Sequence, residues 1–419
     1  MKEDLSVGER IAHYRRRRGI SQLVLAGRLG RSESWVSKVE RGERRIDRLS
    51  VIQEVAKALD IEPIALTGRL SGRVGEARSP GSSEQRNPQA EAECVIEAIR
   101  EAFTRPDGVV RALQRHQRQR EVPGLLTLRR AVDHAWRAFQ ATRYSVLGRV
   151  LPDLIAEAEL ATDELTGDEA LAATGLLSQA YQVTTITLIK LGAHDLAWLC
   201  ADRSMEAAKR SQDELLLGGS ARGLLHAQLE HGHYARAKEL ATGAAAAFES
   251  RLGRGSPALL SIYGALLLRG SVASSRQGDR SATRDLLREA AVAADLLGAD
   301  RNCCWTAFGP TNVAVHRVHA AVMLGDGSEA IEQGLAIDLA NLPVLERRAR
   351  FLIDLAHGYS LCAKDSEALT TLLKAERLAP EEIRLTPVVR EIVGELLRRQ
   401  RRTGAKELRA LADRVGALA

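Results

Sequence analysis

Asn312, His316 and His319 are the side chains of the C-terminal half whose types and spacing best suit ligand binding. They stand at i, i+4 and i+7, so they share one face of an expected helix that is otherwise mostly apolar. Amides and imidazoles donate and accept hydrogen bonds, so this stripe suits a peptide backbone or a small ligand. The alternative is a hydrogen-bonded network between neighbouring helices that faces a wet groove.

Two other clusters, one of histidines and one of cysteines, are weaker indications of a metal site and of a redox-sensitive site. His226, His231 and His233 have metal-like spacing, yet no further Cys or His motif completes a site, so we expect no metal. Cys303 and Cys304 are adjacent thiols that are either oxidant-sensitive or simply buried apolar residues. The chain has no P-loop, G-x-G-x-x-G, H-E-x-x-H or G-x-S-x-G motif. We therefore expect no catalytic residue, no cofactor and no enzymatic activity.

The composition favours helices throughout. Aromatic residues make up only 4% of the 419 residues, while Ala, Leu and Arg are abundant. This balance predicts an all-α protein rather than a large sheet. The five scattered cysteines suit reduced thiols, and the chain shows neither an apolar run of membrane-spanning length nor the apolar core of an export signal. We expect a cytoplasmic protein with no membrane partner.

The positive charge of the chain is concentrated at one end. Residues 1–70 hold 15 Lys and Arg against 10 Asp and Glu, a balance of +5, while the whole chain carries +6. The other 349 residues therefore contribute only about +1. A local basic excess of this kind indicates a module that binds a polyanion, and nucleic acid is the expected partner.

Short helices between residues 6 and 66 must position these charges. Gly19 ends the first, Ser21 caps the second, and Ser32 caps a third helix over residues 33–41. The tetra-arginine run 15–18 is expected to be mostly solvated. The apolar residues expected to face inward, including those of a fourth helix over 50–59, are Ile11, Tyr14, Leu23, Leu25, Ala26, Leu29, Trp35, Val36, Val39, Val51, Ile52, Val55, Ala56 and Leu59.

Segment 19–44, GISQLVLAGRLGRSESWVSKVERGER, carries a specific family pattern. Two short helices meet at a tight turn at Gly30, and the second is preceded by a cap, as in a helix-turn-helix. The segment resembles the Xre/Cro/phage-repressor family. The residues that stand where the pattern of that family places them are Gln22, Ala26, Gly30, Ser32, Val36, Glu40 and Gly42.

This resemblance implies double-stranded operator DNA as a partner, with the third helix in the major groove. Glu33, Ser34, Ser37 and Lys38 would then face base edges. Glu33 either accepts from cytosine N4 or only stabilises the start of the helix, and Lys38 either reads guanine or binds phosphate. Phosphate contacts are implied for Gln22, Ser32 and Arg41. Trp35 departs from the small or polar residue common at its position, and it is either buried or placed against the sugar-phosphate backbone.

The remainder of the chain is divided into a linker and a helical repeat region. We place the boundaries at 1–67 for the helix-turn-helix domain, 68–92 for a Gly-, Ser- and Pro-rich flexible linker, and 93–419 for the repeats. Turn-like segments place Gly192, Gly232, Gly278, Gly325 and Ala363 at equivalent positions, 38 to 47 residues apart. Small residues or Thr follow five residues later in every copy, and small residues follow twelve residues later in four of five.

This spacing predicts helix pairs that cross closely at small residues, with a left-handed residue ending each first helix. The region resembles the tetratricopeptide repeat, although its copies are longer than the usual ~34 residues. The alternative is an irregular bundle of helical hairpins. The expected architecture is thus an N-terminal helix-turn-helix domain plus a C-terminal TPR-like α-solenoid.

The combined architecture resembles bacterial transcriptional regulators, actinobacterial ones in style, that couple a helical sensor to a DNA-reading domain. It implies a homodimer on a roughly two-fold operator, with the solenoid sensing a peptide, a small molecule or a protein partner. This second step is an analogy of architecture rather than an inference from residues. The alternative is a TPR-type interaction scaffold, such as an antitoxin-like or developmental adaptor, in which DNA binding is secondary.

Overall fold

The chain forms two compact units, Met1–Ser83 and Glu84–Ala419. A computed structural model describes residues 8, 11–12, 14–15, 20–29, 31–41, 51, 55–56, 58–59, 88–104, 122–399 and 405–417. Every regular element among these residues is a helix, which confirms the all-α fold class. The predicted turn at Gly30, the helix end at Gly42 and residues 68–87 of the predicted linker lie outside the described residues.

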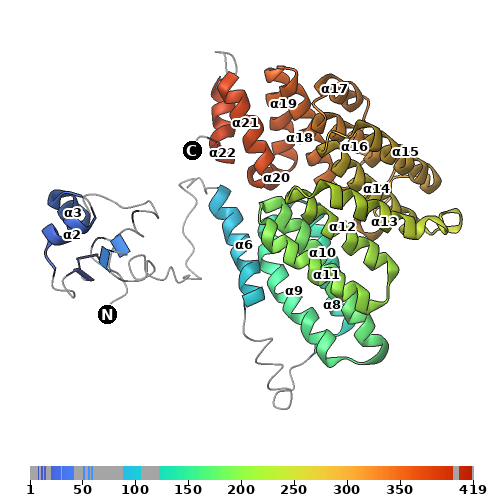
Figure 1. Ribbon diagram of the computed structural model, residues 1–419, viewed down its shortest axis with the longest axis horizontal. Helices are drawn as coiled ribbons and strands as arrows, with labels where there is room; N and C mark the ends of the chain where they lie inside the picture. Colours follow the sequence, from blue (N-terminus) through green and yellow to red (C-terminus); the bar gives the residue numbers. More distant parts are fainter. Residues whose placement is uncertain are drawn as a thin grey trace. The chain divides into compact units, whose positions relative to one another are not determined.

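The N-terminal unit contains helices α2 (Gln22–Arg28) and α3 (Glu33–Glu40), shown in blue in Figure 1. The hydroxyl oxygens of Ser21 and Ser32 each accept a backbone N–H three residues further on, at 3.2 Å. Each serine thereby satisfies one of the N–H groups that a helix start leaves without an intrahelical acceptor. Both predicted N-caps are confirmed.

A small apolar core holds these helices together. Its buried members are Ile11, Leu25, Ala26, Val36, Val39, Val55, Ala56 and Leu59. The prediction that Leu23 faces inward is wrong, because this side chain is 63% exposed. Leu23 lies two residues before Leu25 on α2, and two helical residues are about 200° apart, so burial of one turns the other to solvent. Trp35 is half-buried at the edge of the core.

The C-terminal unit is built from sixteen helices of the described chain. Their bounds are α6 (Pro88–Thr104), α8 (Leu125–Gln140), α9 (Tyr144–Glu164), α10 (Gly167–Leu191), α11 (His194–Ser211), α12 (Glu214–Glu230), α13 (Tyr234–Glu249), α14 (Pro257–Arg276), α15 (Arg280–Leu297), α16 (Pro310–Met323), α17 (Gly327–Leu335), α18 (Leu345–Leu361), α19 (Asp365–Leu378), α20 (Pro380–Leu385), α21 (Pro387–Arg399) and α22 (Ala405–Val415). Helix α6 begins at Pro88, inside the segment that the sequence predicts as a linker.

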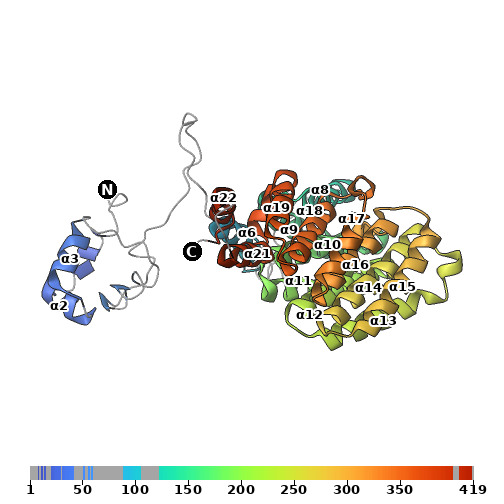
Figure 2. The same ribbon diagram turned by 90° about the horizontal axis from the view of Figure 1, so that it is seen from above.

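Six consecutive helix pairs, from α8/α9 to α18/α19, stack to form a solenoid (Figures 1 and 2). The first helices of successive pairs, α8, α10, α12, α14, α16 and α18, pack against one another in order. Three hydrophobic cores follow one another along this stack. The predicted TPR-like solenoid is therefore confirmed, and the irregular bundle is excluded.

The turn inside each pair has the geometry that its sequence predicts. Gly192, Gly232, Gly278, Gly325 and Ala363 all have positive φ, between 54° and 84°. After each of them, the next residue donates its N–H to a carbonyl five residues earlier, at 2.8–2.9 Å. This hydrogen bond satisfies a carbonyl at the helix end that would otherwise lack a partner.

The small residues predicted to follow each turn lie where the two helices cross. Those five residues after the turn are all buried: Ala197, Ala237, Thr283, Ala330 and Ala368. Of those twelve residues after the turn, Ser204, Ala290 and Ala375 are buried, whereas Ala244 and Ile337 are only partly so. The first set therefore marks the close crossing more reliably than the second.

The helix pair α8/α9 lacks the sequence pattern that marks the other five pairs. Thr142 joins α8 to α9 with φ 55°, and the N–H of Arg143 bonds to the carbonyl of Ala138 as in the other turns. Five residues later stands Leu147, which is fully buried but large. Neither a Gly nor a small residue marks this copy, so a search for small residues passes over it.

The end of the solenoid returns to its beginning. Glu382 in α20 accepts a hydrogen bond from the hydroxyl of Tyr144 in α9, and its other oxygen accepts one from Lys190 in α10 at 2.6 Å. Ser145 donates its backbone N–H and its hydroxyl to Glu381, both at 2.9 Å. Leu385 belongs to the first hydrophobic core. Contacts between residues over 230 positions apart therefore close the solenoid into a ring.

Helix α14 alone among the described helices is long and apolar enough to span a membrane. It lies at the centre of the solenoid, and most of its apolar window is buried against α13, α15 and α16. Its composition is therefore that of a core helix.

Candidate functional sites

Helix α3 presents a polar outer face. Glu33, Ser34 and Lys38 are exposed, whereas Val36 and Val39 on the opposite face are buried. The alternation follows from 3.6 residues per turn, which places 34, 37, 38 and 41 away from the core. Of the other predicted DNA-contact residues, Ser32 and Arg41 are exposed, while Ser37 is half-buried.

A buried ion pair holds α3 in place. Arg15 forms two hydrogen bonds with the carboxylate of Glu40, at 2.6 and 2.9 Å, and donates a third to the carbonyl of Ile20. The hydrogen bond to Glu40 raises the pKa of Arg15 above its usual value. The prediction that the 15–18 run is mostly solvated is wrong for Arg15, which is 9% exposed. Arg16, Arg17 and Arg18 lie outside the described residues.

Gln22 completes this network. Its amide donates to the second oxygen of Glu40 at 2.7 Å, so the start of α2 is tied to the end of α3. Gln22 therefore braces α3 against the start of α2. The side chain is half-buried, and its phosphate contact stays a prediction.

Trp35 is held by a cation. The guanidinium of Arg31 lies over the indole ring, 5.6 Å from its centre. Arg31 is exposed and the ring is half-buried, so this pair forms the edge of the outer face of α3. Of the two alternatives for Trp35, burial is thus realised only in part.

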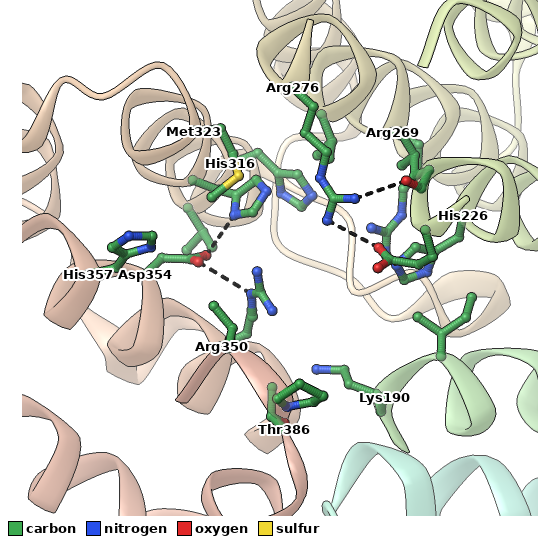
Figure 3. Close-up of a pocket in the computed structure, with 18 of the residues that line it drawn as sticks. Lys190, His226, Arg269, Arg276, His316, Met323, Arg350, Asp354, His357 and Thr386 are labelled. Atoms are coloured by element: carbon green, nitrogen blue, oxygen red, sulfur yellow. Dashed lines mark hydrogen bonds and ion pairs between the residues drawn. The ribbon is translucent and has the colours of Figure 1, made fainter. Parts of the chain in front are cut away.

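The second candidate site is a cavity of about 540 Å³ inside the solenoid ring (Figure 3). Helices α10, α12, α14, α16, α18 and α21 all contribute to its lining. The lining is rich in charge and imidazole: Lys190, His194, His226, Glu230, Arg269, Arg276, His316, His319, Glu346, Arg347, Arg350, Asp354, His357 and Glu391. The ring closure described above determines the size of this cavity.

Two of the three predicted ligand residues line the cavity. His316 and His319 are among its walls, whereas Asn312 is not, so a ligand contact of Asn312 stays a prediction. Asn312 is 2% exposed, its backbone carbonyl pairs with Nδ1 of His316 at 2.9 Å, and its side-chain oxygen is buried without a partner. Asn312 lies between His316 and His319 in angle around the helix axis, so it is its position one turn earlier along the helix that separates it from the cavity wall.

Ion pairs link the walls of the cavity. Lys190 bonds to Glu346 and to Glu382, each at 2.6 Å, and Arg276 pairs with Glu230 at 3.1 Å. On the other side, Asp354 pairs with Nδ1 of His319 at 3.1 Å and with Arg350 at 3.3 Å. Figure 3 shows Lys190 of α10, Arg276 of α14 and Asp354 of α18 around the cavity. Sequence reasoning missed all the charged members, because no local spacing marks them.

The imidazoles of the cavity favour the neutral form. Burial and the nearby charges of Arg269 and Arg276 hold the pKa of His226 well below its usual value. Burial and the charge of Arg347 do the same to the pKa of His316. Because the Asn312 carbonyl can only accept, a neutral His316 carries its proton on Nδ1 and presents Nε2 as an acceptor.

The other clusters singled out in the sequence lie elsewhere. His231 and His233 stack beside Trp198 at a turn, apart from His226 in the cavity wall. Within the described residues, no group of three His, Cys, Asp or Glu side chains has the arrangement of a metal site. Cys304 is half-buried, and burial raises the pKa of its thiol to about 11, which disfavours the reactive thiolate.

Comparison with known proteins adds the following. One similar solved structure is the Bacillus thuringiensis protein PlcR in complex with the peptide PapR7 and DNA; it is 17% identical, and the match covers 70% of this chain and 95% of that chain with a TM-score of 0.30. No curated protein sequence gives a significant match. Residues 6–69 match the family model of the helix-turn-helix domain. The chain therefore carries an N-terminal helix-turn-helix domain.

Proposed function

We propose that the protein is a sequence-specific DNA-binding transcriptional regulator. The observation that carries the proposal is the exposed polar face of α3, displayed by a domain that matches the helix-turn-helix model. In such domains the second helix of the motif enters the major groove and its outer residues meet base edges. The basic balance of residues 1–70 supplies attraction to phosphate.

Individual residues of α3 have different expected roles. Ser34 and Lys38 are donors on the outer face and suit base contacts, while Ser32 and Arg41 at the two ends suit phosphates. Glu33 lies in the first turn of α3, where its negative charge interacts favourably with the helix dipole. Its carboxylate is also a suitable acceptor for the amino group at cytosine N4.

The test compares specific with non-specific binding. A footprint across promoter regions first identifies the operator; Ser34→Ala and Lys38→Ala are then titrated against the operator and against unrelated DNA of equal length. Loss of a base contact weakens operator binding by about 1–3 kcal/mol and leaves non-specific binding less affected. Lys374→Ala, exposed on α19, is the matched control. Equal losses on both DNAs would reduce the two residues to phosphate contacts, and the absence of any footprint would overturn the proposal.

The same proposal assigns the central cavity to an effector. Its volume of about 540 Å³ falls within the range of small-ligand pockets, roughly 300–1,000 Å³. A cavity of this size favours a small molecule or a short peptide over the long protein segment that an interaction scaffold would hold. The regulator is expected to be a cytoplasmic homodimer in which effector binding shifts the two DNA-reading domains. Mass spectrometry of ligand released from the native protein tests this assignment.

A further inference from the structure

Three arginines from three helices meet at one end of the cavity. Arg269 of α14 and Arg347 of α18 line it, and Arg222 of α12 lies buried close by at 7% exposed. Their proximity appears in their mutual effects: burial and the positive charges of Arg347 and Arg222 hold the pKa of Arg269 well below its usual value. Burial and the charge of Arg347 lower the pKa of Arg222 to about 10.

The carboxylates at this end are already engaged. Glu346 is shared between Lys190 at 2.6 Å and Arg347 at 3.5 Å. Glu382 is shared between Lys190 and Tyr144. Burial opposes ionisation of Glu346, yet the charges of Arg347 and Lys190 outweigh it and hold its pKa well below the usual value. Glu346 is therefore ionised, and its charge is already shared by two cations in direct contact with it.

Arg222 and Arg269 have no carboxylate of their own: Glu346 acts on both of them across space, but it is in contact with Lys190 and Arg347. Across the part of the chain that the structure describes, neither has an ion pair or hydrogen bond to another residue, and Nε of Arg222 is buried without a partner. Four cations, Lys190, Arg222, Arg269 and Arg347, thus face two carboxylates. A buried cation without a counter-ion is unfavourable, so an excess of this kind favours a bound anion.

Two buried polar atoms in the walls have no partner within the protein and are therefore available to a polar ligand. The hydroxyl of Thr386, in a residue 5% exposed, and Nδ1 of His226 both line the cavity and have no hydrogen-bond partner. Buried polar groups in folded proteins nearly always have partners. Figure 3 shows Arg269 and His226 on one side of the cavity and Thr386 beside Lys190.

We propose that this end of the cavity is an oxyanion site, in which Arg269 and Arg347 bind a carboxylate or phosphate group of a small ligand. The guanidinium group is planar and matches either oxyanion with two parallel hydrogen bonds. His316 presents an acceptor in the same cavity, so the ligand also carries an N–H or O–H donor. The proposal rests on the assignment of the cavity to an effector and narrows the effector to an anionic molecule.

The experiment measures thermal unfolding of the full chain against sodium acetate and against inorganic phosphate. Sodium chloride keeps the ionic strength constant, which removes non-specific screening. We expect a saturable rise in the melting temperature with at least one probe. A response to acetate alone identifies a carboxylate site, a response to phosphate alone a phosphate site, and responses to both a site that accepts either group.

Substitutions test whether the probe binds at Arg269. Arg269→Gln should weaken probe binding roughly tenfold or more. The matched control Arg236→Gln, exposed on α13, should respond as the unaltered chain does. Without a probe, Arg269→Gln and Arg269→Met should melt at the same temperature as the unaltered chain or higher, because each removes one of several positive charges that repel one another at this end of the cavity.

Three results would overturn the proposal: no saturable response to either probe, an unchanged response in Arg269→Gln, or a large fall in melting temperature in both Arg269 variants. The last result would make Arg269 a structural residue. DNA binding is measured separately on the same samples by gel shift. An oxyanion response without operator binding would keep this inference and overturn only the regulator function.

Discussion

At the residue scale, Glu40 connects the segments of the helix-turn-helix domain. One carboxylate accepts two hydrogen bonds from Arg15 and one from Gln22, so it joins the residues before α2, the start of α2 and the end of α3. The side chains of Glu40 and Arg15 are only 4% and 10% exposed. A buried ion pair of this kind adds little to the free energy of unfolding compared with an apolar contact of similar size. Removal of one member is nevertheless strongly destabilising, because it leaves the other charge buried without a partner.

Glu40→Ala should therefore lower the free energy of unfolding of the N-terminal domain by about 3 kcal/mol. The measurement is urea unfolding of fragment 1–83, followed by the fluorescence of Trp35, which is the only tryptophan in that fragment. The control Glu33→Ala, exposed on α3, should change the free energy by about 0.5 kcal/mol or less. Equal effects of the two substitutions would contradict the bracing role of Glu40.

At the element scale, each helix pair depends on one left-handed residue between its helices. Gly278 adopts φ 75°, and a Cβ added there would meet no atom within 4 Å. Ala363 occupies the equivalent position with φ 54°. The two positions thus differ in the presence of a Cβ, and its cost is purely conformational because no neighbour interferes at Gly278.

Reciprocal substitutions test this equivalence. Ala363→Gly should raise the free energy of unfolding of the C-terminal domain by about 1 kcal/mol, and Gly278→Ala should lower it by about as much. Thermal unfolding of the full chain measures both. Changes in the same direction would show that the two turns do not play equivalent roles.

At the scale of the whole C-terminal domain, four of the histidines that line the cavity are shielded from solvent: His316 and His319 are buried, and His226 and His357 are half-buried. Burial lowers the pKa of His226, His316, His319 and His357. Arg269, Arg276, Arg347 and Arg350 face them and strengthen the effect, while Asp354 opposes it for His319 and His357. The folded state therefore binds fewer protons at these sites than the unfolded chain, whose histidines titrate near pH 6.5.

These lowered pKa values make the stability of the C-terminal domain depend on pH. The stability contributed by the neutral histidines is fully present above about pH 6.5 and is lost as the pH falls further, because the unfolded chain takes up protons first. His231, whose pKa is raised chiefly by its hydrogen bond to the Ala227 carbonyl, acts in the opposite direction but is one residue against four. Melting temperatures between pH 8 and pH 5.5 should fall with pH. The fall should be smaller in His316→Gln and unchanged in His134→Gln, which alters a histidine exposed on α8. Melting temperatures that stay constant or rise towards low pH would contradict this reasoning.

The assembly of the chain is also a property of the whole molecule. We expect the C-terminal domain, which forms a compact unit of its own over Glu84–Ala419, to hold the homodimer together. Deletion of residues 1–70 should leave the sedimentation coefficient that of a dimer, after correction for the lost mass. A monomeric repeat fragment would move the dimer contacts to the N-terminal domain.

Features set by local backbone demands were predictable from the sequence. The caps Ser21 and Ser32, the left-handed turns and the small residues after them each satisfy a requirement within about ten residues of chain. Thr142 was missed because a left-handed Thr carries no Gly signal. Asn312 shares a helix face with His316 and His319 but does not line the cavity, because helical spacing gives a shared face and not the limits of a cavity.

The sequence by itself determined the all-helical repeats, the helix-turn-helix domain and the outer face of α3, since helical periodicity and capping act locally. Only the tertiary structure decided that Arg15 and Gln22 meet at Glu40, that Glu382 returns to Tyr144 and Lys190, and that the ring encloses a cationic cavity. These pairs lie 18 to 238 residues apart. Charge pairing across such separations depends on how the helices stack and how the ring closes, and no local spacing encodes it.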